Sequence, residues 1–201
     1  MRLLKGILFL LLIVLVFGWC VDLFSDKQTL QDNLIRLHVV ADSDQPEDQR
    51  IKLKVRDAIT AYIQPLLESV DSKEEAHERI RSQLDKLEEV ANRTLEQLGA
   101  AYSAVVTLTE EAFDTRHYDT FSLPSGVYDS LRVTIGNGEG ANWWCVVFPS
   151  LCVPASADDF QDTAASSGFD DSLTNTINRE YKIRFFFLDC LGKIENFFRR
   201  R

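Results

Sequence analysis

The chain has 201 residues, of which 45% are hydrophobic and 26% are charged, and its formal net charge at pH 7 is −9. This length and composition suit one globular domain with a single hydrophobic core. The acidic balance argues against nucleic acid as a partner, because binding to phosphates needs a basic surface that releases counterions.

An apolar segment lies near the N-terminus. Two basic residues precede an uninterrupted apolar run from Gly6 to Val21, and acidic residues follow it. The run is intermediate in length between the core of a cleaved signal peptide and a membrane span of roughly 20 residues. The charges at its two ends favour a cytoplasmic N-terminus and an exported body. We therefore expect a signal peptide or membrane anchor at 1–24, a linker at 25–33 and an exported domain at 34–198.

The first half of this domain predicts one strand and two long helices. Residues 34–42 (LIRLHVVAD) are apolar and β-branched, which indicates a buried strand. A stripe of apolar residues at three- and four-residue steps predicts a helix that starts near Asp44 and ends or kinks at Pro65. A second such stripe predicts another helix that is capped by Ser72 and ends at Gly99.

The second half predicts a sheet. Residues 101–109 alternate as a strand does, and VYDSLRVTI (127–135) and NWWCVVF (142–148) flank a glycine-rich connection, so these two are expected to pair as an antiparallel hairpin. NWWCVVF lacks a polar face after its first residue, which is typical of a central strand covered on both sides. The remaining expectations are a polar loop at 155–179, a strand at 181–188 and a short helix at 189–198.

These elements together predict an α+β fold. The expected fold is a single domain with a mostly antiparallel sheet and two long helices on one face, after the apolar N-terminal helix. The three histidines are scattered, and no pattern of metal ligands joins them, so we expect no metal and no cofactor.

Two cysteines close together call for a structural or a catalytic explanation. A reactive cysteine needs a helix N-terminus or a nearby cation, whereas Cys145 lies mid-strand beside Trp144, where desolvation disfavours a thiolate. A Cys145–Cys152 disulfide would stabilise the fold by about 2.5 kcal/mol in the chain-entropy model. Two buried free thiols are the alternative, because cysteine is among the most buried residue types.

Aromatic residues and arginine gather on the predicted hairpin. These residue types dominate hot spots in protein–protein interfaces. Packing in the core is the alternative explanation, since adjacent residues of a strand point to opposite faces and at least one of the two tryptophans must face inward. The candidate partner-binding residues are Tyr128, Arg132, Asn142, Trp143 and Trp144.

Three blocks of sequence carry a family resemblance. They are LIRLHVVADSDQPEDQRIKLKVRDAI, LPSGVYDSLRVTIGNGEGANWWCVVFPSLC and YKIRFFFLDCLGKIENFF, and they cover most of the chain from Leu34 onward. The blocks resemble the stage II sporulation protein R family of endospore-forming bacteria, with GEGxNWWCVVFPxLC as the most specific motif. The positions carried over are Arg36, His38, Asp42, Ser43, Asp44, Lys54, Arg56, Asp57, Gly126, Tyr128, Arg132, Asn142, Trp143, Trp144, Cys145, Pro149 and Cys152.

The resemblance implies a signalling protein that is made in the forespore and exported into the space between the forespore and mother-cell membranes. Such proteins trigger a membrane-embedded aspartic protease of the mother cell, which matures the precursor of sigma-E. The implied role is binding, without an enzymatic activity or a small-molecule substrate. Two other classes stay open: an extracytoplasmic hydrolase that uses Cys145 as nucleophile, and a non-catalytic envelope scaffold.

Overall fold

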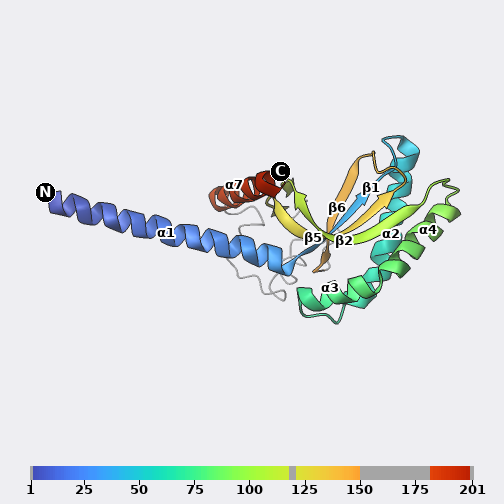
Figure 1. Cartoon of the computed structure of the whole chain (residues 1–201), viewed down its shortest axis with the longest axis horizontal. Coiled ribbons are helices and arrows are strands. Elements are labelled where there is room, and N and C mark those ends of the chain that lie inside the picture. Colours follow the sequence, from blue (N-terminus) through green and yellow to red (C-terminus); the bar gives the residue numbers. More distant parts are fainter. Residues whose placement is uncertain (1, 118–120, 150–181, 200–201) are drawn as a thin grey trace.

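A computed structural model of the chain describes residues 2–117, 121–149 and 182–199. In chain order the elements are α1 (Arg2–Asn33), β1 (Ile35–Val40), α2 (Pro46–Leu67), α3 (Lys73–Ser82), α4 (Leu84–Gln97), β2 (Ala104–Phe113), β3 (Arg116–His117), β4 (Ser122–Leu123), β5 (Gly126–Ile135), β6 (Asn142–Phe148) and α7 (Lys182–Arg199). These elements confirm the predicted α+β class and the apolar N-terminal helix (Figure 1). The domain boundaries remain a prediction, and the predicted loop at 155–179 lies outside the described residues.

Four strands form the main sheet in the order β2-β5-β1-β6. Strand β1 is parallel to β5 and antiparallel to β6, and β2 is antiparallel to β5. The predicted mostly antiparallel sheet is therefore confirmed. The predicted hairpin of β5 with β6 is wrong, because β1 lies between these two strands. The prediction that NWWCVVF is a central strand is also wrong, since β6 is at one edge of the described sheet.

The glycine-rich connection crosses over the end of β1 instead of folding back as a hairpin. The amides of Glu139 and Gly140 donate to the carbonyl oxygens of Asp42 and Ala41, at 3.1 and 3.0 Å. A Cβ atom at Gly140 would lie 2.3 Å from the carbonyl oxygen of Ser43, which is closer than any side chain could approach. Glycine at this position therefore lets the backbone pass directly over β1.

Asp44 helps to hold this crossing rather than cap α2. Its carboxylate accepts a hydrogen bond from the amide of Ala141 at 2.7 Å. The N-cap residue of α2 is Gln45, whose side chain makes no capping hydrogen bond, and Pro46 follows as the first helical residue. Proline is tolerated there because the first amides of a helix have no partner within the helix.

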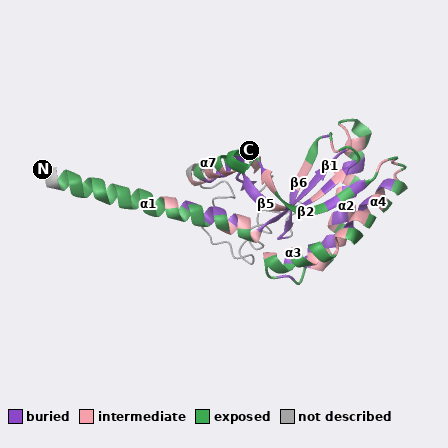
Figure 2. Ribbon diagram, viewed as in Figure 1, coloured by how far each residue is buried: buried purple, intermediate pink, exposed green. Residues whose placement is uncertain are grey.

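Helices α2, α3 and α4 lie together on one side of the sheet, and α7 lies on the other (Figure 1). The predicted second helix is two helices, α3 and α4, with a break at Gln83. Figure 2 shows buried residues along the sheet and on the inward sides of these helices. Central members of this main core are Leu37, Val39, Val55, Ile59, Leu87, Ala91, Leu131 and Val133.

A smaller core covers one end of the opposite face of the sheet. Its buried members are Leu30, Leu34, Phe113, Phe121, Leu123, Tyr128 and Val146. Leu30 belongs to α1, which continues through the residues predicted as a linker at 25–33. That segment is therefore helical and packs against the domain.

The predicted last strand at 181–188 is wrong, because α7 begins at Lys182 and includes this segment. A short apolar run such as FFFL does not distinguish a buried strand from a helix by its period. The helix predicted at 189–198 forms the second half of α7. Helix α7 buries Leu188 and Gly192 against the domain, so tertiary packing extends the helix over the whole segment.

Ser72 caps α3 as predicted, which gives a first test of the local structure. Its side-chain oxygen accepts a hydrogen bond from the amide of Glu75 at 3.3 Å. Ser72→Ala should lower the free energy of unfolding by about 1 kcal/mol, because an amide at the start of the helix loses its partner. Urea unfolding of the detergent-solubilised chain would measure this. Ser82→Ala, at the exposed end of α3, is the matched control, and equal losses in the two variants would contradict the capping role.

Candidate interaction surface

Strand alternation directs one set of polar side chains to the face of the sheet opposite the main core. In β1, Leu37 and Val39 belong to the main core, so His38 points to the other face. His38 pairs in register with Arg132 of β5 and with Trp144 of β6. Residues in register on adjacent strands share a face of the sheet, so these three side chains lie side by side.

Five side chains on this face form what we term the open-face cluster: His38, Glu111, Arg132, Asn142 and Trp144. The Nδ1 atom of His38 lies 3.0 Å from Oε2 of Glu111, and its Nε2 atom lies 3.0 Å from Oδ1 of Asn142. A guanidinium nitrogen of Arg132 donates to Oε1 of Glu111 at 2.6 Å. Glu111 therefore joins β1 and β5 through both of its carboxylate oxygens.

The indole ring of Trp144 contacts the side chains of His38 and Arg116. Its ring stacks on the imidazole of His38 with centroids 5.3 Å apart and an interplanar angle of 20°. The guanidinium carbon of Arg116 lies 3.4 Å from the centroid of the indole. A cation at this distance from an aromatic face is attracted by the ring quadrupole. These two contacts together orient the half-buried indole at the surface.

The surroundings of Glu111 favour its ionised form at neutral pH. Its burial alone would raise the pKa of the carboxyl, but hydrogen bonds from His38 and Arg132 outweigh burial and lower the pKa to about 2. The side chain of Glu111 is only 16% exposed. A fixed negative charge at the centre of the cluster thus holds His38 and Arg132 in place.

Acid should weaken the fold through Glu111. A carboxyl with a lower pKa in the folded state stabilises the fold above its unfolded pKa, near 4.5, and this stabilisation is lost as pH falls toward the folded pKa, near 2. We expect Glu111→Gln to lower the free energy of unfolding by about 2 kcal/mol at neutral pH, after allowance for solvent screening. The difference from wild type should shrink as pH falls through this window.

Urea unfolding of wild type and variant at a series of pH values would measure the effect. Glu110→Gln is the matched control, because Glu110 is the adjacent residue and its ion pair with Arg199 lies at the surface. Surface ion pairs contribute little to stability. Parallel pH profiles for wild type and Glu111→Gln would contradict the role given to Glu111.

Two of the predicted partner-binding residues lie outside the open-face cluster. Trp143 points to the opposite face, where it packs against the main core, and the guanidinium carbon of Arg56 lies 4.2 Å from its ring centroid. Tyr128 is buried in the smaller core, and its hydroxyl donates to the carbonyl oxygen of Pro124 at 3.0 Å. The structure brings together only Arg132, Asn142 and Trp144 from the predicted set.

Two members of the open-face cluster, His38 and Glu111, are absent from the predicted partner-binding residues, and so is Arg116, which contacts Trp144. His38 lies in a block that carries the family resemblance, and its position in register with Trp144 depends on the pairing of β1 with β6. Glu111 lies beyond the predicted end of its strand, because β2 continues to Phe113. Extending the predicted alternation by two residues beyond Thr109 places Glu111 on the strand.

Cys145 is buried and disulfide-bonded, and Cys20 and Cys190 are free. Cys152 lies outside the described residues, so the Cys145–Cys152 pairing stays a prediction. Within the described ranges, no group of three or more histidine, cysteine or acidic side chains could hold a metal ion.

Helix α1 is long and apolar enough to cross a membrane. Its span runs from Leu4 to Asn33 with a mean hydropathy of 2.8 in its most apolar window, and 6% of that window is buried. Figure 2 shows the first part of α1 exposed along its length. An exposed apolar helix near an N-terminus is compatible with a signal sequence or an anchor.

Comparison with known proteins connects this fold to sporulation. Residues 31–158 match the family described as Stage II sporulation protein R, and the match includes the whole open-face cluster. A relative named Stage II sporulation protein R, from Bacillus subtilis (strain 168), is 41% identical over 123 residues, which cover 61% of this chain and 55% of the relative. The match thus spans about half the length of that relative. No solved structure matches the chain. The chain belongs to the stage II sporulation protein R family.

Proposed function

We propose that this chain is an exported signalling protein that activates a membrane-embedded aspartic protease in the opposing membrane, and that this activation leads to processing of pro-sigma-E. Family membership supports the role in sporulation. The apolar α1 supports export, either as a signal peptide or as an anchor. The site of action is the space between the forespore and mother-cell membranes.

The observation that carries the mechanism is the open-face cluster. Tryptophan and arginine are the side chains that contribute most to binding energy in protein interfaces. Here Trp144 is oriented by His38 and Arg116, and Arg132 is oriented by Glu111. Side chains that are already ordered lose little conformational entropy on binding, so the cluster is suited to contact the receptor protease.

Binding activates a receptor only if the ligand prefers its active state. A ligand with equal affinity for the inactive and active states shifts no equilibrium, however tightly it binds. We therefore assign to the open-face cluster contacts that form in the active state of the protease. This mechanism requires no bond-breaking chemistry in the signalling protein itself.

The state of Cys145 favours activation by binding over hydrolysis. A nucleophilic cysteine acts as a thiolate that the substrate can reach. Cys145 is buried among core residues and its sulfur is already in a disulfide. The sulfur therefore has a structural role: its disulfide stabilises the strand that carries Trp144, the adjacent residue.

Co-expression in a non-sporulating bacterial host would test the proposal. The host would carry the full chain, the candidate receptor protease and its pro-sigma substrate, and processed sigma would be detected by immunoblot. We expect processing only when all three are present. A chain that lacks residues 2–24, and is therefore retained in the cytoplasm, is the matched control and should give none.

Two cysteine variants separate the alternatives. Cys145→Ser and Cys152→Ser should reduce processing to a similar extent if the two residues form a cross-link, whereas a nucleophile would make only Cys145→Ser fatal. An exported, folded chain that leaves the protease inactive would contradict the proposal and favour an envelope scaffold.

A further inference from the structure

Helix α7 presents an apolar face whose large side chains are mostly exposed to solvent. The exposed large residues are Phe186, Phe187, Ile194, Phe197 and Phe198, with exposed fractions from 40% to 72%. At about 100° per residue, their spacing places all five within an arc of roughly 120° on one side of the helix. Five large apolar side chains on a single face exceed the scattered exposure that is usual on a soluble surface.

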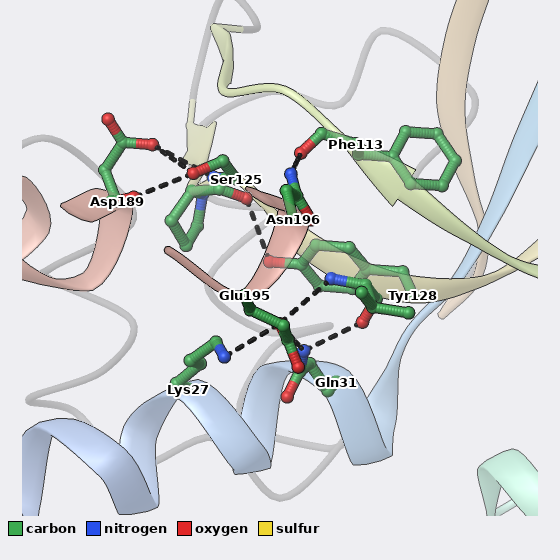
Figure 3. A network of polar contacts seen from close by, with 10 residues as sticks. Lys27, Gln31, Phe113, Ser125, Tyr128, Asp189, Glu195 and Asn196 are labelled. Carbon is green, nitrogen blue, oxygen red and sulfur yellow. Dashed lines mark hydrogen bonds and ion pairs between the residues drawn. The ribbon is translucent and has the colours of Figure 1, made fainter. Parts of the chain in front are cut away.

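The other side of α7 is fixed to the domain, so this apolar face cannot turn inward. The amide and hydroxyl of Ser125 donate to Oδ1 of Asp189 at 3.1 and 2.7 Å. Lys27 of α1 forms an ion pair with Glu195 at 2.8 Å, and Gln31 donates to the same carboxylate at 3.0 Å. Figure 3 shows these contacts joining α1, α7 and the start of β5.

The apolar face of α7 begins where the apolar part of α1 ends. The rings of Trp19 and Phe187 meet edge to face with centroids 4.7 Å apart. Beyond this contact, Arg184 pairs with Asp26 at 2.5 Å. The polar pairs thus lie on the domain side of the aromatic contact, and the exposed apolar run of α1 from Leu4 to Phe17 lies on the other side. Tryptophan at such a boundary is typical of the interface between lipid and water.

We propose that α7 is an interfacial membrane helix, whose apolar face enters the lipid on the exported side beside α1. Continuity with the apolar part of α1 identifies lipid as the occupant, because a bilayer around α1 reaches the level of Trp19 and Phe187. The helix is followed in sequence by Arg200 and Arg201 after Arg199, and cations beside an apolar helix favour anionic headgroups. This contact goes beyond protease activation, because it orients the whole domain on the membrane.

Spin labelling of the full chain would test this contact. Cys190 lies within the apolar arc of α7 and has a free thiol, so a nitroxide placed there in a Cys20→Ser background reports on the face without a further substitution. The chain would be reconstituted in vesicles of phosphatidylethanolamine and phosphatidylglycerol. We expect the label to collide readily with oxygen, which dissolves in lipid, and to lose accessibility to an aqueous nickel complex.

Matched labels define the two limits of accessibility. Lys86→Cys on exposed α4 gives the value for water and Leu12→Cys on α1 gives the value for lipid, each in a Cys20→Ser, Cys190→Ser background. Phe197→Ser with Phe198→Ser should restore nickel accessibility at Cys190. The unfolding midpoint should stay unchanged, because both side chains are exposed in the folded domain.

The outcomes distinguish lipid from other occupants. If the nickel accessibility at Cys190 equals that at Lys86→Cys, the inference is overturned. The label at Leu12→Cys serves as the control here, because its position in lipid shows that α1 is still inserted in the membrane. Spectral broadening at Cys190 that disappears on dilution with unlabelled chain would show that a second copy covers the face, and would also overturn it. Lipid exposure at both Cys190 and Leu12→Cys, without broadening, would support it.

Discussion

Trp144→Ala is expected to reduce processing of pro-sigma-E by about 30-fold, because the loss of one central aromatic contact costs about 2 kcal/mol of binding. The folded domain should survive this change, since Trp144 is half-buried and lies at the edge of the smaller core. Processing in the co-expression host measures activity, and urea unfolding of the purified chain measures stability.

Trp143→Ala is the matched control, because it removes the same side chain at the adjacent residue but from the opposite face. Trp143 packs against the main core, so its loss should lower the free energy of unfolding by about 2 kcal/mol. The folded fraction should still activate the protease. If the two variants lose activity and stability in the same proportion, the open-face cluster has no specific part in recognition.

Gly192→Ala is expected to detach α7 from the domain. A Cβ atom at this position would lie 1.5 Å from the carbonyl oxygen of Ser125, which is backbone and cannot move aside easily. Replacing glycine with alanine stabilises a helix by about 1 kcal/mol, whereas overpacking typically costs about 1–3 kcal/mol and occasionally more. The cost of the steric clash should therefore exceed the gain in helix propensity. The hydrogen bonds between Ser125 and Asp189 should break when α7 moves away.

Hydrogen exchange of the α7 amides would measure this detachment. Gly18→Ala in α1 is the matched control, because it makes the same substitution in a helix where a Cβ atom meets nothing within 4 Å. We expect faster exchange over 183–199 in Gly192→Ala only. Wild-type protection of α7 in Gly192→Ala would show that the close approach of Gly192 to Ser125 is not required.

Much of the local structure could be predicted from periodicity and turn chemistry. The stripe that contains Val55 and Ile59 indicates α2, and Ser72 with Glu75 marks the start of α3. Where the period is ambiguous, prediction fails: the run of three phenylalanines in α7 fits a strand or a helix. The contacts of Gly192 and Asp189 with Ser125, 64 residues away from Asp189 in the chain, favour the helix.

The candidate site was predicted only in part, for a related reason. Residue type predicts Arg132 and Trp144, the family-like block adds Asn142, and the structure brings these three together. Tyr128 and Trp143 were chosen by the same criterion and lie elsewhere. Residue type identifies side chains that are able to bind a partner, but it does not say on which face of a sheet they lie.

An apolar N-terminal helix, an α+β domain and membership of a sporulation family therefore follow from the chain's residues, because these depend on local periodicity and on contiguous blocks of sequence. The order β2-β5-β1-β6 and the meeting of His38, Glu111 and Trp144 follow from tertiary structure. Strands pair through backbone hydrogen bonds, which are the same whichever strand is the partner. A shift of one residue in the pairing register moves every side chain to the opposite face of the sheet. The insertion of β1 between β5 and β6 is what places His38 against Trp144.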